Sequence, residues 1–213
     1  MKIKVSEKIG SVTGEINTPE NPKAILVLAH GAGAGMNHPF MKSTSDELNQ
    51  RAIATLRFNF AFIEQKKGRP DFPAVAHATI EAAILMAEKK FAGLPLFAGG
   101  KSFGGRMTSQ LMASKPISSV MGIIFFGFPL HQPGNPGVER ADHLNEVKVP
   151  MLFLQGTRDA LADFSLIQKI VNGLKKSKLV SFEGADHSFK APKQNLIPLL
   201  ANSAAEWMLK IKA

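Results

Sequence analysis

A serine stands among small residues in a pattern that is typical of an activated nucleophile. The segment Gly100-Lys101-Ser102-Phe103-Gly104 matches G-x-S-x-G. An apolar run precedes the segment and a helical pattern follows it, which is the context that a strand-to-helix nucleophile turn requires. The turn is sharp, so the residues two positions away from the serine must be small, and both are glycine. We interpret Ser102 as a nucleophile; the alternative is a serine that caps the helix.

A serine hydroxyl is a weak nucleophile unless a base takes its proton. The sequence has six histidines, and His187 follows the last expected strand in the segment Glu183-Gly184-Ala185-Asp186-His187. In chain order, this is where the base of a serine, acid and histidine set is expected. His77 falls within a helical pattern, which indicates a structural or surface role. His187 is therefore the predicted base, and the alternative is a histidine of a surface loop.

Asp159 is the predicted acid that orients the histidine. It follows the apolar run 149–155 and so stands at the carboxyl end of an expected strand. One helix and one strand separate it from His187, so both residues can emerge at the same edge of the sheet. Asp163 is the main rival, because it lies four residues further on. Asp186 ranks third, since adjacent side chains diverge in an extended loop; Asp159 could also serve only as a turn or capping residue.

A loop of tiny residues, His30-Gly31-Ala32-Gly33-Ala34-Gly35, follows the third expected strand. Small side chains let the backbone approach a substrate carbonyl, so that free N–H groups can stabilise an oxyanion. We predict the N–H groups of Phe103 and Ala32 as the two donors, with Gly33 as the alternative to Ala32. His30 is expected to fix the loop. A phosphate-binding loop is disfavoured, because the segment lacks the lysine and hydroxyl of a P-loop.

The remaining sequence predicts the elements that position these residues. Apolar runs indicate strands and longer amphipathic stretches indicate helices. The expected strands are 3–5, 11–16, 24–29, 54–60, 94–99, 120–128, 149–155 and 178–182, and the expected helices are 41–51, 72–91, 102–115, 164–175 and 196–211. This alternation predicts an α/β fold with about eight mostly parallel strands and helices on both faces. The first two strands have no helix between them, so they could pair antiparallel at one edge.

Composition narrows the class of protein. The 213 residues fit one domain over residues 1–213. There is no cysteine, which excludes disulfides and a thiol nucleophile and is compatible with a reducing compartment. The first residues are charged where a signal peptide would be apolar, and no apolar run could span a bilayer, so we expect a cytoplasmic protein without a membrane partner. The net charge of +9 is spread along the chain, so no nucleic-acid partner is expected.

Several segments in order resemble the α/β-hydrolase superfamily: HGAGAG, LRFNF, GGKSFGGR, FGFPLHQPG, QGTRD and GADHSF. More narrowly, they resemble the compact dienelactone-hydrolase-like group, which includes uncharacterised bacterial α/β hydrolases and a hydrolase-like domain of an animal chromatin-complex subunit. The resemblance implies an α/β-hydrolase fold without a large cap domain, and only residues 129–148 separate the sixth and seventh strands. Dienelactone hydrolases proper use a cysteine nucleophile, which this chain lacks, so the resemblance does not extend to dienelactone as the substrate.

These residues predict a serine hydrolase that cleaves a carboxylic ester through an acyl-enzyme intermediate. Thioesters and small amides are the alternative substrates. The expected partner is a small-molecule acyl substrate, and neither a cofactor nor a metal ion is needed. A different class is a non-catalytic interaction module that retains the fold, because fold does not fix function.

Further residues bear on the shape and charge of the pocket. Arg140, Asp142 and His143 could contact an acidic substrate or belong to a solvated loop, and sequence alone favours neither. The pocket shape is expected to depend on a set of apolar residues, namely Phe40, Phe60, Phe62, Phe103, Leu130 and Leu161.

Overall fold

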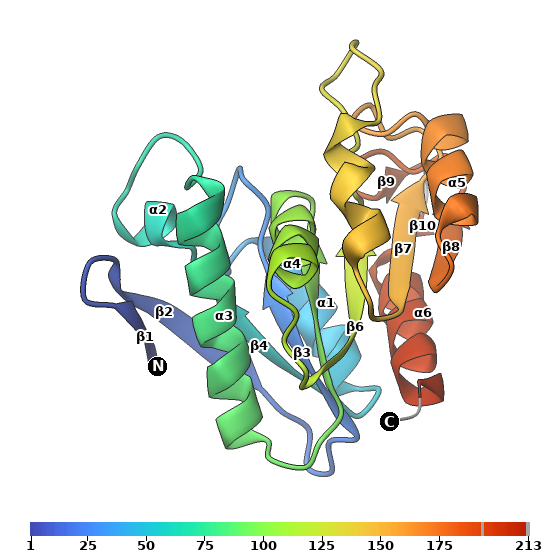
Figure 1. The fold of residues 1–213 in the computed structure, drawn as a ribbon. Helices are drawn as coiled ribbons and strands as arrows, with labels where there is room; N and C mark the ends of the chain where they lie inside the picture. The colour runs from blue at the N-terminus through green and yellow to red at the C-terminus, as the bar shows by residue number, and fades with distance from the viewer. Residues whose placement is uncertain (193, 212–213) are drawn as a thin grey trace.

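Eight strands form one sheet in the computed structural model, which describes residues 1–192 and 194–211 (Figure 1). The strand order is β1-β2-β4-β3-β5-β6-β7-β8. Strands β3 to β8 run parallel, whereas β1 and β2 pair antiparallel at one edge. The predicted mostly parallel sheet is confirmed. The strands are β1 (Lys2–Ser6), β2 (Gly10–Asn17), β3 (Ala24–Ala29), β4 (Ile53–Phe58), β5 (Leu96–Lys101), β6 (Val120–Phe126), β7 (Met151–Gly156) and β8 (Ser177–Phe182).

Helices cover both faces of the sheet and enclose two separate cores. In Figure 1, α3, α4 and α5 lie in front of the sheet, and α1 and α6 lie behind it. The central strands β3 and β4 are buried along their whole length, as expected for strands covered on both faces. The helices are α1 (Pro39–Asn49), α2 (Ala61–Glu64), α3 (Pro73–Lys90), α4 (Phe103–Ser114), α5 (Phe164–Gly173) and α6 (Ile197–Lys210). Within the described residues, no helix is long and apolar enough to span a membrane.

The structure corrects the sequence-based elements mainly in the connections. Strand β4 ends at Phe58, two residues before the predicted end, and the short helix α2 follows. Phe60 is buried directly before α2, so its apolar character extended the predicted strand too far. Residues 129–148 were expected to be a loop, but a 3-10 helix, η1 (Glu139–Glu146), forms in its second half. The small hairpin β9 (Lys190–Ala191) and β10 (Gln194–Asn195) was also not predicted.

Gly104, in the first turn of α4, allows this helix to pack against β3. A Cβ atom at this position would lie 2.6 Å from the carbonyl oxygens of both Ala29 and His30. Because those oxygens belong to the backbone, we expect Gly104→Ala to lower the free energy of unfolding by about 1–3 kcal/mol, as measured by urea denaturation.

Gly173 provides the matched control, since it also lies in a helix, α5, but has no atom within 4 Å of its would-be Cβ. Gly173→Ala should leave stability unchanged or raise it by up to ~1 kcal/mol. Equal losses in the two variants would contradict the packing argument.

Candidate active site

Ser102 occupies a strained turn between β5 and α4. Its backbone has φ of 50° and ψ of −115°, a region that residues with a Cβ atom rarely adopt. Gly100 is packed so closely that a Cβ atom there would lie 2.1 Å from the carbonyl oxygen of Ala29. The motif therefore requires small residues for a steric reason, because the turn packs directly against the neighbouring strand β3. Such strain is common at functional sites, where the surrounding structure holds it in place.

The structure brings the three predicted side chains together in one hydrogen-bonded chain. The Nε2 atom of His187 lies 2.8 Å from Ser102 Oγ, and its Nδ1 atom lies 2.7 Å from Asp159 Oδ2. The residues come from the loops after β5, β7 and β8, all at the carboxyl edge of the sheet. The side chain of Asp159 is 1% exposed and that of His187 is 21% exposed. The imidazole thus bridges a buried carboxylate and a hydroxyl at the surface of a cavity.

A buried glutamine that sequence reasoning missed helps to fix the aspartate. Gln155, within β7, donates from Nε2 to Asp159 Oδ2 at 2.6 Å, and its Oε1 accepts the N–H of Phe128 at 2.9 Å. The N–H of Leu161 donates to the other carboxylate oxygen at 2.8 Å. Gln155 is fully buried. The signal that could have found it is a polar residue in an otherwise apolar strand, four residues before the acid.

The two rival acids are engaged elsewhere. Asp163 caps α5, where its carboxylate accepts the N–H of Leu166 at 3.1 Å. Asp186 accepts the N–H groups of Ser188 and Lys190, each at 2.8 Å, within its own loop. Both carboxylates thus stabilise local turns, and the carboxylate that the structure places against the histidine is that of Asp159.

His30 is buried and holds the glycine-rich loop through both ring nitrogens. Its Nε2 accepts the N–H of Phe60 at 3.0 Å, so Nδ1 carries the proton and donates to the carbonyl of Gly31 at 2.7 Å. Burial lowers the pKa of His30 to about 4, against the opposing effect of the bond to Gly31. His30 is therefore neutral at physiological pH. Since C=O and N–H point in opposite directions across a trans peptide, this bond turns the N–H of Ala32 away from His30.

A cavity of about 410 Å³ opens beside Ser102 and His187. The loop 30–34 forms one wall, and Phe40, Met41 and Leu161 supply its apolar part. Among the described residues, no protein group accepts a hydrogen bond from the N–H of Phe103 or of Ala32. Both donors are thus free for a ligand. Gly33 lines the same wall, so the choice between Ala32 and Gly33 stays open.

The apolar residues that were expected to shape this pocket divide into two groups. Phe40 and Leu161 line the cavity directly. Phe60 and Phe62 instead pack against His30, with the rings of Phe60 and His30 4.9 Å apart, and Phe103 packs against both phenylalanines. A further expected residue, Leu130, is buried in the core. Phe60 and Phe62 thus support the cavity wall through their contacts with His30.

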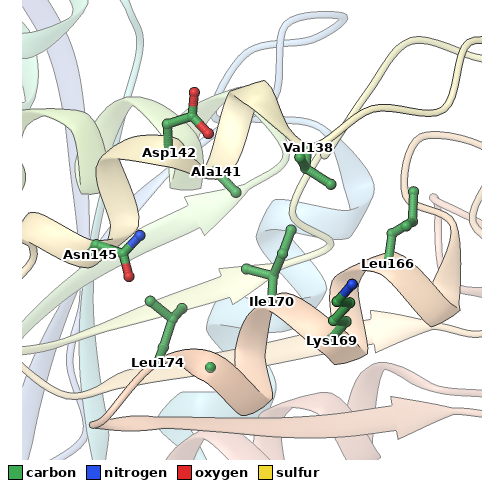
Figure 2. A pocket seen from close by; sticks show the side chains of 9 residues that line it. Val138, Ala141, Asp142, Asn145, Leu166, Lys169, Ile170 and Leu174 are labelled. Atoms are coloured by element: carbon green, nitrogen blue, oxygen red, sulfur yellow. The ribbon is translucent and has the colours of Figure 1, made fainter.

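Three polar residues after β6 lie away from the cavity. Arg140 donates to the carbonyl of His131 at 3.0 Å, and His143 Nε2 lies 2.7 Å from Ser109 Oγ. Burial lowers the pKa of His143 to about 4. Asp142 lines a separate groove of about 370 Å³ between η1 and α5, which Figure 2 shows. Within residues 1–192 and 194–211, none of these three side chains lines the Ser102 cavity.

In the described ranges, no three or more His, Cys, Asp or Glu side chains are grouped so that they could hold a metal ion.

Comparison with known families assigns the class of protein. Residues 22–206 match the model of an α/β-hydrolase domain family. The chain therefore belongs to this α/β-hydrolase family, and its fold is the compact α/β-hydrolase fold without a large cap domain.

Among curated proteins, the chain is 27% identical over 204 residues to a Mycobacterium tuberculosis protein provisionally named a phosphoribosyl transferase, found in two strains. The match covers 93% of this chain but 43% of that protein. The chain thus spans less than half the length of the curated relatives that it matches.

Solved structures share the fold at low sequence identity. Dienelactone hydrolase from Anabaena variabilis superimposes with a TM-score of 0.79 at 19% identity, covering 100% of this chain and 97% of that one. Est1E from Butyrivibrio proteoclasticus, with ferulic acid bound, gives 0.77 at 17% identity over 99% and 98%. An α/β serine hydrolase without a lid from Xanthomonas campestris gives 0.73 at 19% identity over 99% and 93%. At these identities the likeness concerns the fold.

Proposed function

We propose that this hydrolase cleaves carboxylic esters of small molecules, with Ser102 as its nucleophile. The observation that carries the proposal is the unbroken hydrogen-bonded chain from Asp159 through His187 to Ser102 Oγ, which ends at a cavity. A hydroxyl bonded to an imidazole that is oriented by a buried carboxylate is the arrangement of nucleophilic acyl transfer.

The proposed reaction has two steps. Ser102 Oγ attacks the ester carbonyl while His187 Nε2 takes the hydroxyl proton, and His187 then returns that proton to the departing alcohol. His187 then takes a proton from a water molecule as that water attacks the acyl group on Ser102, and it returns the proton to Ser102 Oγ as the acid departs. Asp159 keeps the proton of the neutral imidazole on Nδ1, so that Nε2 remains free to act as the base.

The oxyanion that forms in both steps needs donors that are in place before the reaction. The N–H of Phe103 lies at the start of α4, where the helix dipole favours negative charge. The N–H of Ala32 is oriented by the bond between His30 and Gly31. Removing one donor of this kind typically costs ~10²–10³ in turnover.

The name of the Mycobacterium tuberculosis relative carries no assignment for this chain, because that protein is more than twice as long as the match. The competing function is an interaction module without catalysis. A module of this kind has no need of the strained serine turn or of an aligned base, so the geometry of Ser102 favours the enzyme.

Labelling with a fluorophosphonate probe tests the proposal. We expect the wild-type protein to form a covalent adduct at Ser102, identified by peptide mass spectrometry, and to hydrolyse short-chain p-nitrophenyl esters. Ser188 provides the matched control, because this exposed serine also lines the cavity. Labelling should persist in Ser188→Ala and disappear in Ser102→Ala. An unlabelled wild-type protein, or equal labelling of both variants, rejects the proposed nucleophile.

A further inference from the structure

Lys101, the residue directly before the nucleophile, carries a positive charge, and no carboxylate lies within ion-pair distance of it among the residues that the structure describes. Strand β5 turns this side chain toward the core that contains α1 and α6, between the loops that follow β3 and β8. None of the ion pairs found in the described part of the chain involves Lys101. Part of the residue lines the cavity, but its ammonium is enclosed. An enclosed cation without a counterion costs stability, so its presence calls for a reason.

The ammonium of Lys101 joins two parts of the active site. Its Nζ donates a hydrogen bond to the backbone carbonyl of His187. It also lies 5.3 Å from the ring centroid of Phe189 and 5.8 Å from that of Phe40, within the range of cation–π contacts. Gly127 leaves room for it, because a Cβ atom there would lie 3.1 Å from Nζ.

The loop that carries His187 needs such a restraint. Phe189 has a φ of 58°, a left-handed conformation that is uncommon for a bulky residue. Its ring is buried and stacks on Phe40 at 5.9 Å, and its edge-to-face partner is Phe182 at 5.8 Å. The strained backbone is thus held by packing on one side, and the carbonyl of His187 is held by Lys101 on the other.

We propose that Lys101 is a positioning residue, whose ammonium fixes the backbone of His187 and thereby keeps the imidazole in line with Ser102. This inference rests on the proposed function of Ser102 and His187. Because Lys101 adjoins the nucleophile in sequence, one side chain ties the turn that carries the nucleophile to the loop that carries the base. A shift of about 1 Å in such a group can cost on the order of 10²-fold in rate.

The charge of Lys101 predicts a pH dependence. Burial lowers the pKa of Lys101 to about 8, while the carboxylates of Asp159 and Asp186 oppose that shift. The other titratable groups around it are the imidazoles of His187, His30 and His38, which share the cavity. As the pH rises through about 8, the ammonium loses its proton and the cation–π contacts weaken. Wild-type kcat should therefore fall on the alkaline side, near pH 8.

Whereas kcat should fall as the pH rises, the free energy of unfolding should increase. The folded pKa lies below that of free lysine, so the unfolded chain holds this proton more tightly between about pH 8 and 10. The charged form therefore disfavours folding at pH 7, and this cost disappears as the pH rises through that window. A residue kept only for stability would not carry such a cost.

The experiment compares Lys101→Met, Lys101→Arg and Lys42→Met with the wild type. The methionine variant keeps the length of the side chain but loses the donor and the charge, whereas arginine keeps both at alkaline pH. Lys42 is exposed on α1 and controls for loss of one cation near the cavity. We expect Lys101→Met to lower kcat ~10–100-fold with little change in KM, and Lys101→Arg to restore most of it. Lys42→Met should behave as the wild type.

Two further readouts separate positioning from a structural role. Lys101→Met should unfold at the same temperature as the wild type or higher, and Lys101→Arg should lose the alkaline fall near pH 8. A methionine variant with wild-type kcat and an unchanged pH profile would overturn the proposal. If the methionine variant fails to fold, Lys101→Arg alone decides the test. In that case, a fall of kcat near pH 8 that persists in Lys101→Arg overturns the proposal.

Hydrogen exchange tests the restraint without any substrate. Backbone amides of residues 183–192 should exchange faster in Lys101→Met than in Lys42→Met. If exchange is faster in Lys101→Met but the wild type shows neither labelling nor turnover, the restraint is supported and the proposed function is rejected. Equal exchange together with normal labelling would reject the restraint alone.

Discussion

Replacing either Ser102 or His187 with alanine is expected to lower kcat for an activated ester on the order of 10⁴–10⁶-fold. The two side chains share one hydrogen bond of 2.8 Å, so removing either one disables the same step. Without the hydroxyl there is no acyl-enzyme, and without the imidazole the hydroxyl keeps its proton. The measurement is hydrolysis of p-nitrophenyl acetate by purified variants, with far-UV circular dichroism to verify the fold.

The double variant Ser102→Ala/His187→Ala gives the sharper result. Groups that act as a unit are strongly non-additive, so we expect the double variant to be no slower than the slower single variant. His143→Ala is the matched control for loss of a histidine, because that imidazole bonds Ser109 and lies outside the cavity lining. Losses that multiply in the double variant would show that Ser102 and His187 act independently, contrary to the proposed mechanism.

The sequence was sufficient for the residues whose positions follow from backbone sterics and chain order. Gly100 and Gly104 are required because carbonyl oxygens of β3 and of the residue that follows it occupy the space of a Cβ atom, and this constraint is visible as a motif. Asp159 and His187 follow parallel strands, whose carboxyl ends meet at one edge. Strand order and direction were therefore enough to bring these residues together.

Side-chain partners were not predictable in the same way. Gln155 and Lys101 both lie within strands, and their importance depends on which distant groups they meet: Asp159 in one case and the carbonyl of His187 in the other. Contacts of this kind depend on packing across the sheet, which has no periodic signature in sequence. The helix η1 was missed for a related reason, since only Ala141 and Leu144 are buried in it and the helical pattern is weak.

The residues that line the cavity could not be identified from sequence either. Phe60 and Phe103 were expected to shape the pocket, but Phe60 packs against His30 and Phe103 packs against Phe60 instead. Phe40, by contrast, lines the cavity and also lies within cation–π distance of Lys101. All three are phenylalanines that were expected to shape the pocket, so only the fold distinguishes a residue that lines the cavity from one that supports it.

Replacing Asp159 with asparagine should lower kcat by about 10⁴-fold while preserving the fold. The carboxylate accepts three donors: His187 Nδ1 at 2.7 Å and Gln155 Nε2 at 2.6 Å on Oδ2, and the N–H of Leu161 at 2.8 Å on Oδ1. An amide has only one oxygen. If its NH₂ group faces His187, Nδ1 must become an acceptor, and the proton moves to Nε2, which can then no longer act as a base.

The opposite orientation of the amide is disfavoured as well, because its NH₂ group would then face the N–H of Leu161. Two further variants, Asp163→Asn and Asp186→Asn, complete the test, since those carboxylates accept only N–H and O–H groups of their own turns. We expect both to retain kcat close to the wild type, with at most a modest loss of stability from the weakened turns. A larger loss of kcat in either control than in Asp159→Asn would assign the acid to another residue. If Asp159 is the acid, Asp159→Asn should lose far more kcat than the other two asparagine variants. Among the described residues, only the carboxylate of Asp159 bonds His187.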